Sequence, residues 1–342
     1  LHAPMLKFFV PVPFKDVRLL PMLAPPVEGD NRLFQHLPFE EYQGLFEQVD
    51  TSEVADAFLL PHNLTDLRHN VGYVEETLAA AKRAGKRVIL FASQDDPSPL
   101  PYAEAIILRP SVYKSSLGSN EIVIPGIVED LGKIHGVDPL SKGEKPSVGF
   151  VGKAGFDSVT SRFRYFLRNY VLHRGAKKEG MYFRRKALAV MKNDVRLSVR
   201  AIVRSTFGAH AKTVGIPIDE SRLDYINNIK QSLFTLAPRG DGNYSLRFYE
   251  TLSLGRIPVL IDTDMHLPLE DSVPYQDIVV RVPHEKLNGI SDIVFEYWTS
   301  KTEEELVDLQ KRAQEVFSSQ LYFPVFLRNL FASEKFHKQL AV

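Results

Sequence analysis

The sequence has no cysteine among its 342 residues. This absence excludes disulfide bonds and zinc sites built on thiolates, and it fits a reducing compartment. Long apolar runs are also missing, because no stretch approaches the ~18 consecutive apolar residues of a membrane-spanning helix. Net charge is missing as well, since 42 basic residues balance 42 acidic ones. This balance argues against nucleic acid or an anionic membrane as the main partner.

Two common nucleotide-binding signatures are absent too. No Gly-Lys-Ser/Thr follows a glycine-rich turn, so the P-loop pattern is not met. Gly149, Gly152 and Gly155 follow an apolar run, but their spacing differs from Gly-x-Gly-x-x-Gly. The sequence therefore disfavours a P-loop NTPase and weakens a dinucleotide-binding interpretation.

What the sequence does contain is an alternation of short apolar runs with helical patterns. The apolar runs are aliphatic and do not alternate with polar residues, which is typical of buried parallel strands. The pattern predicts strands within 5–12, 56–64, 87–93, 104–111, 120–128, 147–155, 233–238, 256–261 and 277–283. It predicts helices within 39–49, 71–84, 161–204, 223–231 and 301–321. This order indicates α/β domains with parallel sheets.

The length of the chain suggests two such domains. Residues 130–147 are rich in Gly, Pro and Ser without helical periodicity, and they form the best linker. We therefore expect one domain at 1–140, a second at 141–315, and a C-terminal helix at 316–342 that packs back on the first domain. Ligands of parallel α/β sheets lie beyond the carboxyl ends of the strands, and the cleft between the domains is the natural site.

One loop carries an unusual density of chemistry, "LAPRGDGNYSLRFYE", at the carboxyl end of the run 233–238. Gly240 and Gly242 allow a tight turn and a close approach of the backbone to a ligand. Asn243 or Ser245 can cap the helix that follows, whose N-terminus attracts anions. The loop therefore has the features of an anion site.

Charged side chains strengthen this interpretation. Arg239 and Arg247 offer bidentate donors for phosphate oxygens. Glu250 follows Arg247 by about one helical turn, and its carboxylate could accept from a ribose diol. An ordinary surface pair between Arg247 and Glu250 is the alternative structural explanation.

The segment "FTLAPRGDGNYSLRFYETLSLGRIPVLI", followed by "LPLED", resembles the exostosin family of glycosyltransferases. The resemblance rests on a Pro-Arg-Gly loop, a Ser-x-Arg-x-x-Glu helix start and Gly-x-Ile-Pro-Val before Leu-Pro. Weaker pieces, "DAFLLPHNL", "RVILFASQDD", "RPSVYKSS", "EIVIPG" and "VGFVGKA", occur in the family's order, so that the resemblance covers most of residues 50–285. It implies a GT-B fold of two Rossmann-like domains facing across a cleft, and transfer from a nucleotide sugar with inversion.

The resemblance also implies roles for single residues. Arg239, Ser245 and Arg247 would bind the donor diphosphate, and Glu250 the ribose. Lys153 follows a strand and is a further phosphate candidate, although a solvated loop lysine explains it equally well. The full set of donor-binding candidates is Lys153, Arg239, Gly240, Asp241, Gly242, Asn243, Tyr244, Ser245, Arg247 and Glu250.

Inverting transfer needs a base that takes the proton of the acceptor hydroxyl. Asp95 and Asp96 follow a predicted strand in "FASQDDPS", where the family often has Ser-His-Asp, with Gln94 replacing the His. Asp95 fits that position best. His62 is a second candidate, also after a strand. His36 and Glu28 lie in an N-terminal loop that could form an acceptor wall.

Two further segments leave alternatives open. The basic stretch 162–186 is either a solvated helix face or a patch for an anionic acceptor glycan or a lipid-linked diphosphate. Asp262-Thr263-Asp264 spells the Asp-x-Asp of metal-dependent glycosyltransferases. Since arginines and a helix N-terminus already supply positive charge to the diphosphate, we expect no essential divalent metal and no cofactor.

The sequence thus predicts a glycosyltransferase that moves a sugar from a UDP-linked donor to a glycan hydroxyl, without a nucleic-acid partner and with its oligomeric state open. The alternatives are a non-catalytic nucleotide- or glycan-binding module and a metal-dependent Asp-x-Asp transferase. The family's usual cysteines are missing and no membrane anchor is visible, so we expect a cytoplasmic location and leave membrane association open. The first residue is Leu rather than Met, which leaves room for an upstream anchor.

Overall fold

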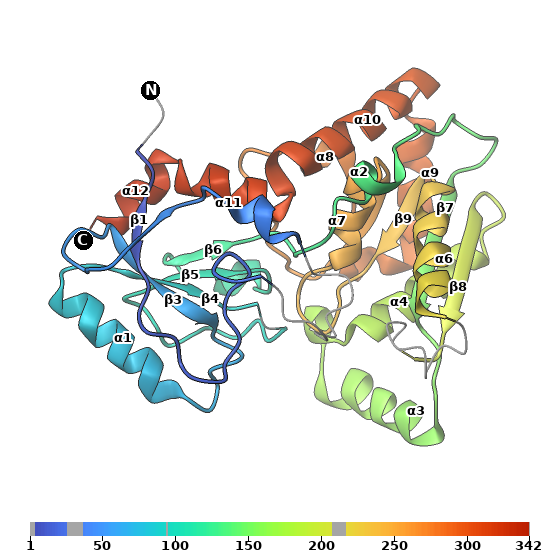
Figure 1. The fold of residues 1–342 in the computed structure, drawn as a ribbon. Coiled ribbons are helices and arrows are strands. Elements are labelled where there is room, and N and C mark those ends of the chain that lie inside the picture. The colour runs from blue at the N-terminus through green and yellow to red at the C-terminus, as the bar shows by residue number, and fades with distance from the viewer. Residues whose placement is uncertain (1–3, 26–36, 94, 207–216, 342) are drawn as a thin grey trace. The chain divides into compact units, whose positions relative to one another are not determined.

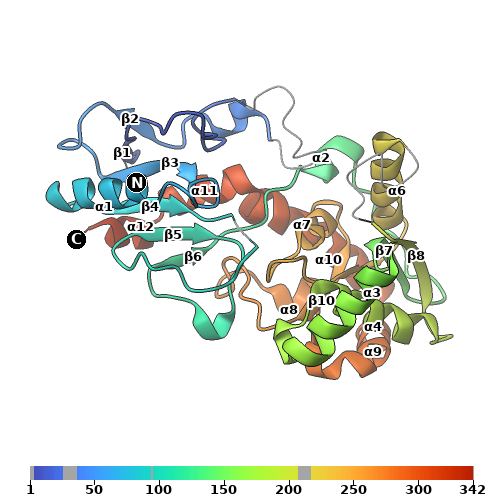
Figure 2. The same cartoon turned by 90° about the horizontal axis from the view of Figure 1, so that it is seen from below.

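The computed structural model describes residues 4–25, 37–93, 95–206 and 217–341, which form two compact α/β units. Unit 1 comprises residues 1–129, 266–269 and 319–342, and unit 2 comprises residues 130–265 and 270–318. Each unit is built on one sheet, and every described strand pairing is parallel. The expected α/β class with two parallel sheets is confirmed (Figures 1 and 2). That the two sheets face each other across a cleft stays a prediction.

Unit 1 contains a six-stranded sheet in the order β2-β1-β3-β4-β5-β6. Its strands are β1 (Lys7–Phe9), β2 (Glu47–Val49), β3 (Ala57–Asn63), β4 (Val88–Phe91), β5 (Ile106–Arg109) and β6 (Glu121–Val123). Its helices are α1 (Val71–Arg83), α11 (Phe323–Phe331) and α12 (Glu334–Leu340), with short 3₁₀ turns at Phe39–Tyr42 and Lys114–Ser116.

Alternating side chains of β1 show how the helices of unit 1 cover the two faces of its sheet. Phe9 contacts Phe58 and packs against the cluster that contains Val74 of α1. Phe8, the preceding residue, contacts Phe331 of α11 edge-on at 5.4 Å. Because successive side chains of a strand point to opposite faces, α1 and α11 cover opposite faces of the sheet (Figure 1). Residues 319–342 thereby belong to unit 1.

Unit 2 contains a five-stranded sheet in the order β11-β10-β9-β7-β8. Its strands are β7 (Ser147–Lys153), β8 (Ser198–Arg204), β9 (Phe234–Ala237), β10 (Ile257–Asp262) and β11 (Val280–Pro283). Its helices are α2 (Leu131–His135), α3 (Val159–Phe166), α4 (Gly180–Lys192), α6 (Ile218–Lys230), α7 (Leu246–Ser253), α8 (Tyr275–Ile278), α9 (Ile290–Thr299) and α10 (Glu303–Val316). Short turns of π or 3₁₀ type lie at Leu167–Leu172, Gly175–Lys177, His284–Gly289 and Phe317–Leu321.

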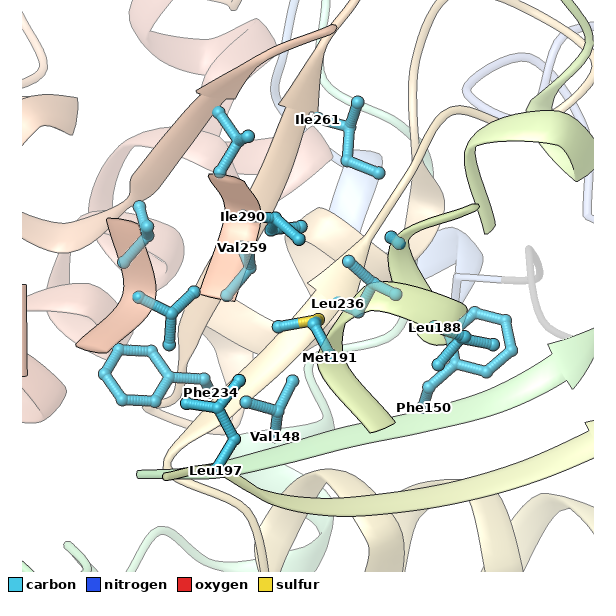
Figure 3. Close-up of a cluster of buried hydrophobic side chains, with 14 of the residues drawn as sticks. Val148, Phe150, Leu188, Met191, Leu197, Phe234, Leu236, Val259, Ile261 and Ile290 are labelled. Carbon is cyan, nitrogen blue, oxygen red and sulfur yellow. The ribbon is translucent and has the colours of Figure 1, made fainter. Parts of the chain in front are cut away.

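The main core of unit 2 lies between the sheet and the helices α4 and α9. Figure 3 shows Leu188 of α4 beside Phe150 of β7, and Met191 of α4 beside Leu236 of β9. The opposite face of β7 meets α6, where a side chain on Gly149 would collide with groups of that helix and the residues after it. Both faces of the sheet are therefore covered at its centre, which explains why the central strands β9 and β10 are almost entirely buried and apolar.

Two details differ from the sequence prediction. The boundary between the units falls at residue 129 rather than 140, because Leu131 of α2 packs in a buried cluster of unit 2. Residues 39–49 were expected to be one helix, but they form a 3₁₀ turn and then the edge strand β2. The positive φ of Gly44 ends the turn between them.

The predicted helical region 161–204 was also partly wrong, since it contains strand β8. This strand lies at the edge of the sheet and its residues are mostly partly or fully exposed, so its sequence lacks the apolar run of a buried strand. Over the described parts of the chain, no helix combines the length and apolar character needed to cross a bilayer.

Candidate functional site

The order of the unit 2 strands locates the site before any side chain is considered. The chain proceeds from β7 outward to β8, then returns to the other side of β7 and continues through β9 to β11. The order therefore reverses between β7 and β9. In open parallel sheets, ligands bind beyond the carboxyl ends of the strands at such a reversal. Here those ends are Lys153 and the loop 238–245.

Arg239 holds the shape of this loop from the inside. Its side chain is buried, and its Nε and Nη2 donate to the carbonyl oxygens of Gly242 and Asp241 at 3.2 and 3.0 Å. Its Nη1 donates to the carbonyl of Ala176 at 3.2 Å. These contacts support a bracing role for Arg239. Its predicted contact with the diphosphate stays a prediction.

Further bonds close the loop and tie it to the next strand. The N–H of Gly240 donates to the carbonyl of Tyr244 at 2.8 Å. Asn243 is fully buried, and its amide donates to the carbonyl of Asp264 while its oxygen accepts from the Thr263 hydroxyl at 2.7 Å. Asn243 therefore connects the loop after β9 with the loop after β10, at the same edge of the sheet.

Ser245 occupies the N-cap position of α7, as the sequence predicted for Ser245 or Asn243, but the expected capping by its side chain is not formed. Ser245 is buried, and its hydroxyl accepts no hydrogen bond from the backbone N–H groups of the first turn of α7. The positive N-terminal end of the α7 dipole is thus not balanced by the N-cap side chain. This helix end lies directly after the site loop 238–245. A bound anion would complete this helix end.

Arg247 lies in the first turn of α7 and extends across β7. Its Nη2 donates to the carbonyl of Val151 at 2.5 Å, and its Nη1 lies 3.5 Å from the carbonyl of Leu236. The guanidinium lies 4.6 Å from the Phe150 ring. A Cβ on Gly152 would come within 2.9 Å of Arg247 Nη2, so a glycine is needed there for this path.

A second guanidinium, that of Arg184 on α4, reaches the same edge of the sheet. It donates to the carbonyls of Lys153 and Arg239 at 3.3 and 3.1 Å. Burial, and then the charge of Arg247, lower the pKa of Arg184 to about 10, with Asp241 opposing the shift. The Nε atoms of Arg184 and Arg247 are buried without hydrogen-bond partners.

The missing counter-charge is the main feature of this pair. Within the described residues, neither Arg184 nor Arg247 forms an ion pair with a carboxylate. Two guanidinium groups held close together in this way favour an anion between them. Arg184 was not identified from the sequence, because it lies 55 residues before Arg239, and only the fold of α4 onto the loop brings the two together.

Glu250 has partners that the sequence did not show. Its two carboxylate oxygens accept from Arg222 at 2.7 Å and from the Tyr225 hydroxyl, both on α6. Burial raises the pKa of Tyr225 above its usual range, and Glu250 adds to the shift, so the phenol stays a donor. The simple surface pair with Arg247 is therefore wrong. A carboxylate oxygen has two acceptor sites, so Glu250 can still take a diol.

The two aspartates of the Asp-x-Asp sequence, Asp262 and Asp264, have structural roles. Asp262 accepts from the Met265 N–H at 3.0 Å and from Arg281 at 2.8 Å, and Arg281 also pairs with Glu270. The residue two positions later, Asp264, has a positive φ of 62°. The carboxylate of Asp262 thus balances Arg281 and holds a turn.

In unit 1, the loop with Asp95 and Asp96 is fixed through its backbone. The buried Arg109 donates to the carbonyl of Asp96 at 2.7 Å, and the Ser111 hydroxyl donates to the carbonyl of Asp95 at 2.9 Å. Both aspartates are exposed. Hydrogen bonds from Ser98 hold the pKa of Asp96 below its usual range. Since a lower pKa makes a weaker base, Asp96 is a weaker base than an ordinary aspartate, and the role of Asp95 as the base stays a prediction.

His62 has a structural role rather than the proposed catalytic one. It is fully buried, its Nε2 accepts from the Phe14 N–H at 2.8 Å, and its Nδ1 lies 2.7 Å from the Arg18 carbonyl. Both ring nitrogens are therefore occupied by the segment after β1. Gln94, His36 and Glu28 lie outside the described residues.

Unit 2 is thus a parallel α/β domain with an uncompensated cationic site at its topological reversal, the kind of domain that binds phosphorylated ligands. Residues 168–295 match the sequence model of the Exostosin GT47 domain. The part of the chain that carries the candidate site therefore resembles the exostosin family. The matched residues include α4, the site loop and Glu250.

Curated glycosyltransferases are similar to parts of the chain. A probable glucuronosyltransferase of Oryza sativa subsp. japonica is 28% identical over 138 residues, 40% of this chain and 28% of the relative. Exostosin-1 of Drosophila melanogaster is 36% identical over 73 residues, 21% of this chain and 10% of that protein. A probable β-1,4-xylosyltransferase of Arabidopsis thaliana is 33% identical over 70 residues, 20% of this chain and 17% of the relative. The matched segments thus span less than a third of each relative.

A solved structure of an S. aureus TarM mutant in complex with fondaparinux, α-GlcNAc-glycerol and UDP is also similar. It covers 81% of this chain and 56% of its own, at 11% identity and a TM-score of 0.39. A likeness of this size is too weak to support a statement on fold or function.

Proposed function

We propose that the chain is an inverting glycosyltransferase that moves a sugar from a UDP-linked donor to a hydroxyl of a glycan acceptor. The observation that carries this proposal is the pair Arg184 and Arg247, two guanidinium groups without a carboxylate partner at the strand reversal of an Exostosin GT47 domain. A nucleoside diphosphate supplies the missing negative charge.

Each residue of the site has a task in this reaction. As the bond to the sugar breaks, negative charge grows on the diphosphate, and donors already in place stabilise that charge. Arg184, Arg247 and the N-terminus of α7 are such donors. Arg239 keeps the loop in shape, and Glu250, oriented by Arg222, accepts from the ribose.

The base and the metal requirement complete the proposal. Asp95 takes the proton of the acceptor hydroxyl while that oxygen attacks the anomeric carbon from the side opposite the diphosphate, which inverts the configuration. The transfer proceeds without a divalent metal. This part is supported by the engagement of the Asp262 carboxylate with Arg281, and by the positive charge that Arg184 and Arg247 would offer to the diphosphate.

A thermal-shift screen followed by a transfer assay tests the proposal. The names of the relatives make UDP-glucuronic acid and UDP-xylose the first donors to try, with UDP-N-acetylglucosamine and GDP-mannose beside them. A donor at a hundredfold excess over its dissociation constant stabilises the fold by about 2.7 kcal/mol, so the true donor raises the melting temperature. Product with an inverted anomeric centre should then form in excess EDTA.

The outcomes separate the alternatives. A chain that binds UDP but yields no product with any donor is a binding module. Activity that vanishes with EDTA and returns only with manganese or magnesium assigns a metal-dependent transferase. Absence of any thermal shift with nucleotides removes the support for the donor site.

A further inference from the structure

Residues 159–178, here called the α3 surface, expose apolar side chains that a soluble helix normally buries. Seven of the eighteen large apolar side chains exposed on the described chain lie within its first fourteen residues. They are Val159, Phe163, Phe166, Leu167, Tyr170, Val171 and Leu172. Phe163 is 67% exposed and Leu172 is 63% exposed, while α3 itself contains no buried residue. Such a concentration marks an interaction surface.

The α3 surface nevertheless has a fixed orientation, because its opposite side is anchored. Tyr165 contacts Phe156 at 5.2 Å, and the buried Asn169 exchanges hydrogen bonds with Glu179 at 2.9 and 3.0 Å. Tyr165 and Asn169 are four residues apart and so share one side of the helix. Phe163 lies about half a turn from Tyr165, and therefore faces away from the anchor.

Positive charge flanks the exposed apolar groups. Residues 159–178 contain six lysines and arginines and no acidic residue, in a chain whose total charge is balanced. Arg168 pairs with Glu179 at 2.8 Å. Within the described residues, Arg162, Arg164, Arg174 and Lys177 form no ion pair with a carboxylate. The cations of the α3 surface are therefore available to an anionic partner.

The aromatic rings add a feature of their own. Phe166 and Tyr170 stack with their centroids 5.2 Å apart, and Lys178 lies 5.1 Å from the Tyr170 ring. Aromatic rings beside lysine and arginine are typical of segments that lie at the interface between water and lipid.

We propose that the α3 surface docks on an anionic lipid bilayer, with Phe163, Phe166 and Leu172 entering the interface and the flanking arginines contacting lipid headgroups. This proposal does not rest on the glycosyltransferase function. An anionic bilayer can bind both kinds of side chain on this surface. Its acyl chains would contact the apolar side chains, and its headgroups would pair with the cations. An anionic glycan would pair with the arginines but leave Val159, Leu167 and Val171 in water. A symmetric pairing of two copies would oppose like charges.

Flotation of the full chain with lipid vesicles tests the proposal. We expect binding to vesicles of equimolar phosphatidylcholine and phosphatidylglycerol, much weaker binding to phosphatidylcholine alone, and weakening by salt. The double change Phe163→Ser/Phe166→Ser and the double change Arg162→Gln/Arg164→Gln should each lower the partition coefficient at least about tenfold. The matched control is Lys192→Gln/Val195→Ser, which removes one exposed cation and one exposed apolar residue elsewhere in unit 2, and should bind as the unchanged chain does.

A fluorescence measurement tests whether the side chain at position 163 enters the bilayer. The chain has one tryptophan, Trp298. We expect Phe163→Trp to gain emission that brominated lipids quench, while Trp298 of the unchanged chain is not quenched. Circular dichroism should show that each variant keeps its helical content.

Four results would overturn the proposal. The folded chain could fail to bind the anionic vesicles at low salt. The Phe163→Ser/Phe166→Ser variant could bind them as well as the unchanged chain. Size-exclusion chromatography could show a dimer that this variant alone dissociates, or a heparin column could retain the chain while vesicles do not, which would assign the surface to a second copy or to an anionic glycan.

Discussion

The guanidinium groups of Arg184 and Arg247 at the carboxyl edge of the unit 2 sheet repel each other in the free protein. The pKa of Arg184, about 10, lies below the 12.5 of an ordinary arginine. When folding lowers the pKa of a cationic side chain, the charged form of that side chain is less favourable in the folded than in the unfolded state. At every pH below about 10 its charge therefore reduces the stability of the free protein. An anion bound between Arg184 and Arg247, as the proposed function requires, would remove this conflict.

The first residue-scale prediction follows from this conflict. Arg184→Met should lower UDP affinity at least about tenfold, because a hydrogen bond to a charged group contributes roughly 1.5–3 kcal/mol. The free energy of unfolding without ligand should change by less than about 1 kcal/mol, since relief of the repulsion offsets the lost bonds to two carbonyls. Isothermal titration and urea denaturation measure the two quantities.

Lys192→Met is the matched control, because Lys192 is an exposed cation at the end of the same helix. It should leave both quantities unchanged. Unaltered UDP binding in folded Arg184→Met would remove Arg184 from the site.

The sequence identified those site residues that form one continuous motif. Arg239, Asn243, Ser245 and Arg247 lie within nine residues, so their glycines, cap signal and charges could be recognised together. Arg184 could not be found in this way, because it stands in a run of arginines and lysines that all look alike in sequence. His62 shows the converse, since only its burial and its two backbone partners reveal that it is structural.

At the scale of elements, buried strands were easier to predict than edge strands. β3, β4, β9 and β10 are nearly fully buried, and their apolar runs specify them. β2 and β8 lie at the edges of the sheets with mostly exposed residues. Their sequences lack that signal, so the pairing with a neighbouring strand decides their conformation.

An element-scale prediction concerns the contact between α4 and the site loop. Gly180 is the first residue of α4, and a Cβ there would lie 2.3 Å from the Arg239 oxygen and 2.4 Å from the Gly240 oxygen. Gly180→Ala should therefore force α4 and the loop apart. We expect a loss of about 1–3 kcal/mol in the free energy of unfolding and a weaker UDP affinity, measured by denaturation and titration.

Gly72 supplies the comparison, because it also lies in the first turn of a helix but has no atom within 4 Å of an added Cβ. Gly72→Ala should be neutral or raise the free energy of unfolding by up to about 1 kcal/mol. Equal stability and UDP affinity for both variants would contradict the close approach of α4 to the loop.

At the scale of the whole molecule, the proposed reaction divides between the units. The cationic site and Glu250 belong to unit 2, whereas Asp95 and Asp96 belong to unit 1. Binding of the donor should therefore depend on unit 2 residues alone. Transfer should need both units, so variants in unit 1 can separate turnover from donor affinity.

The prediction at this scale is that Asp95→Asn keeps UDP-sugar affinity while the rate of transfer falls by about 10²- to 10⁴-fold, because a base contributes only when the proton moves. Asp96→Asn is the matched change on the adjacent residue. Hydrogen bonds from Ser98 lower the pKa of Asp96 and so weaken it as a base, and we expect this variant to retain most of its activity. Isothermal titration gives the affinity, and initial rates at saturating donor give the turnover. Full activity of Asp95→Asn together with loss in Asp96→Asn would transfer the role to Asp96, and full activity of both would place the base outside this loop.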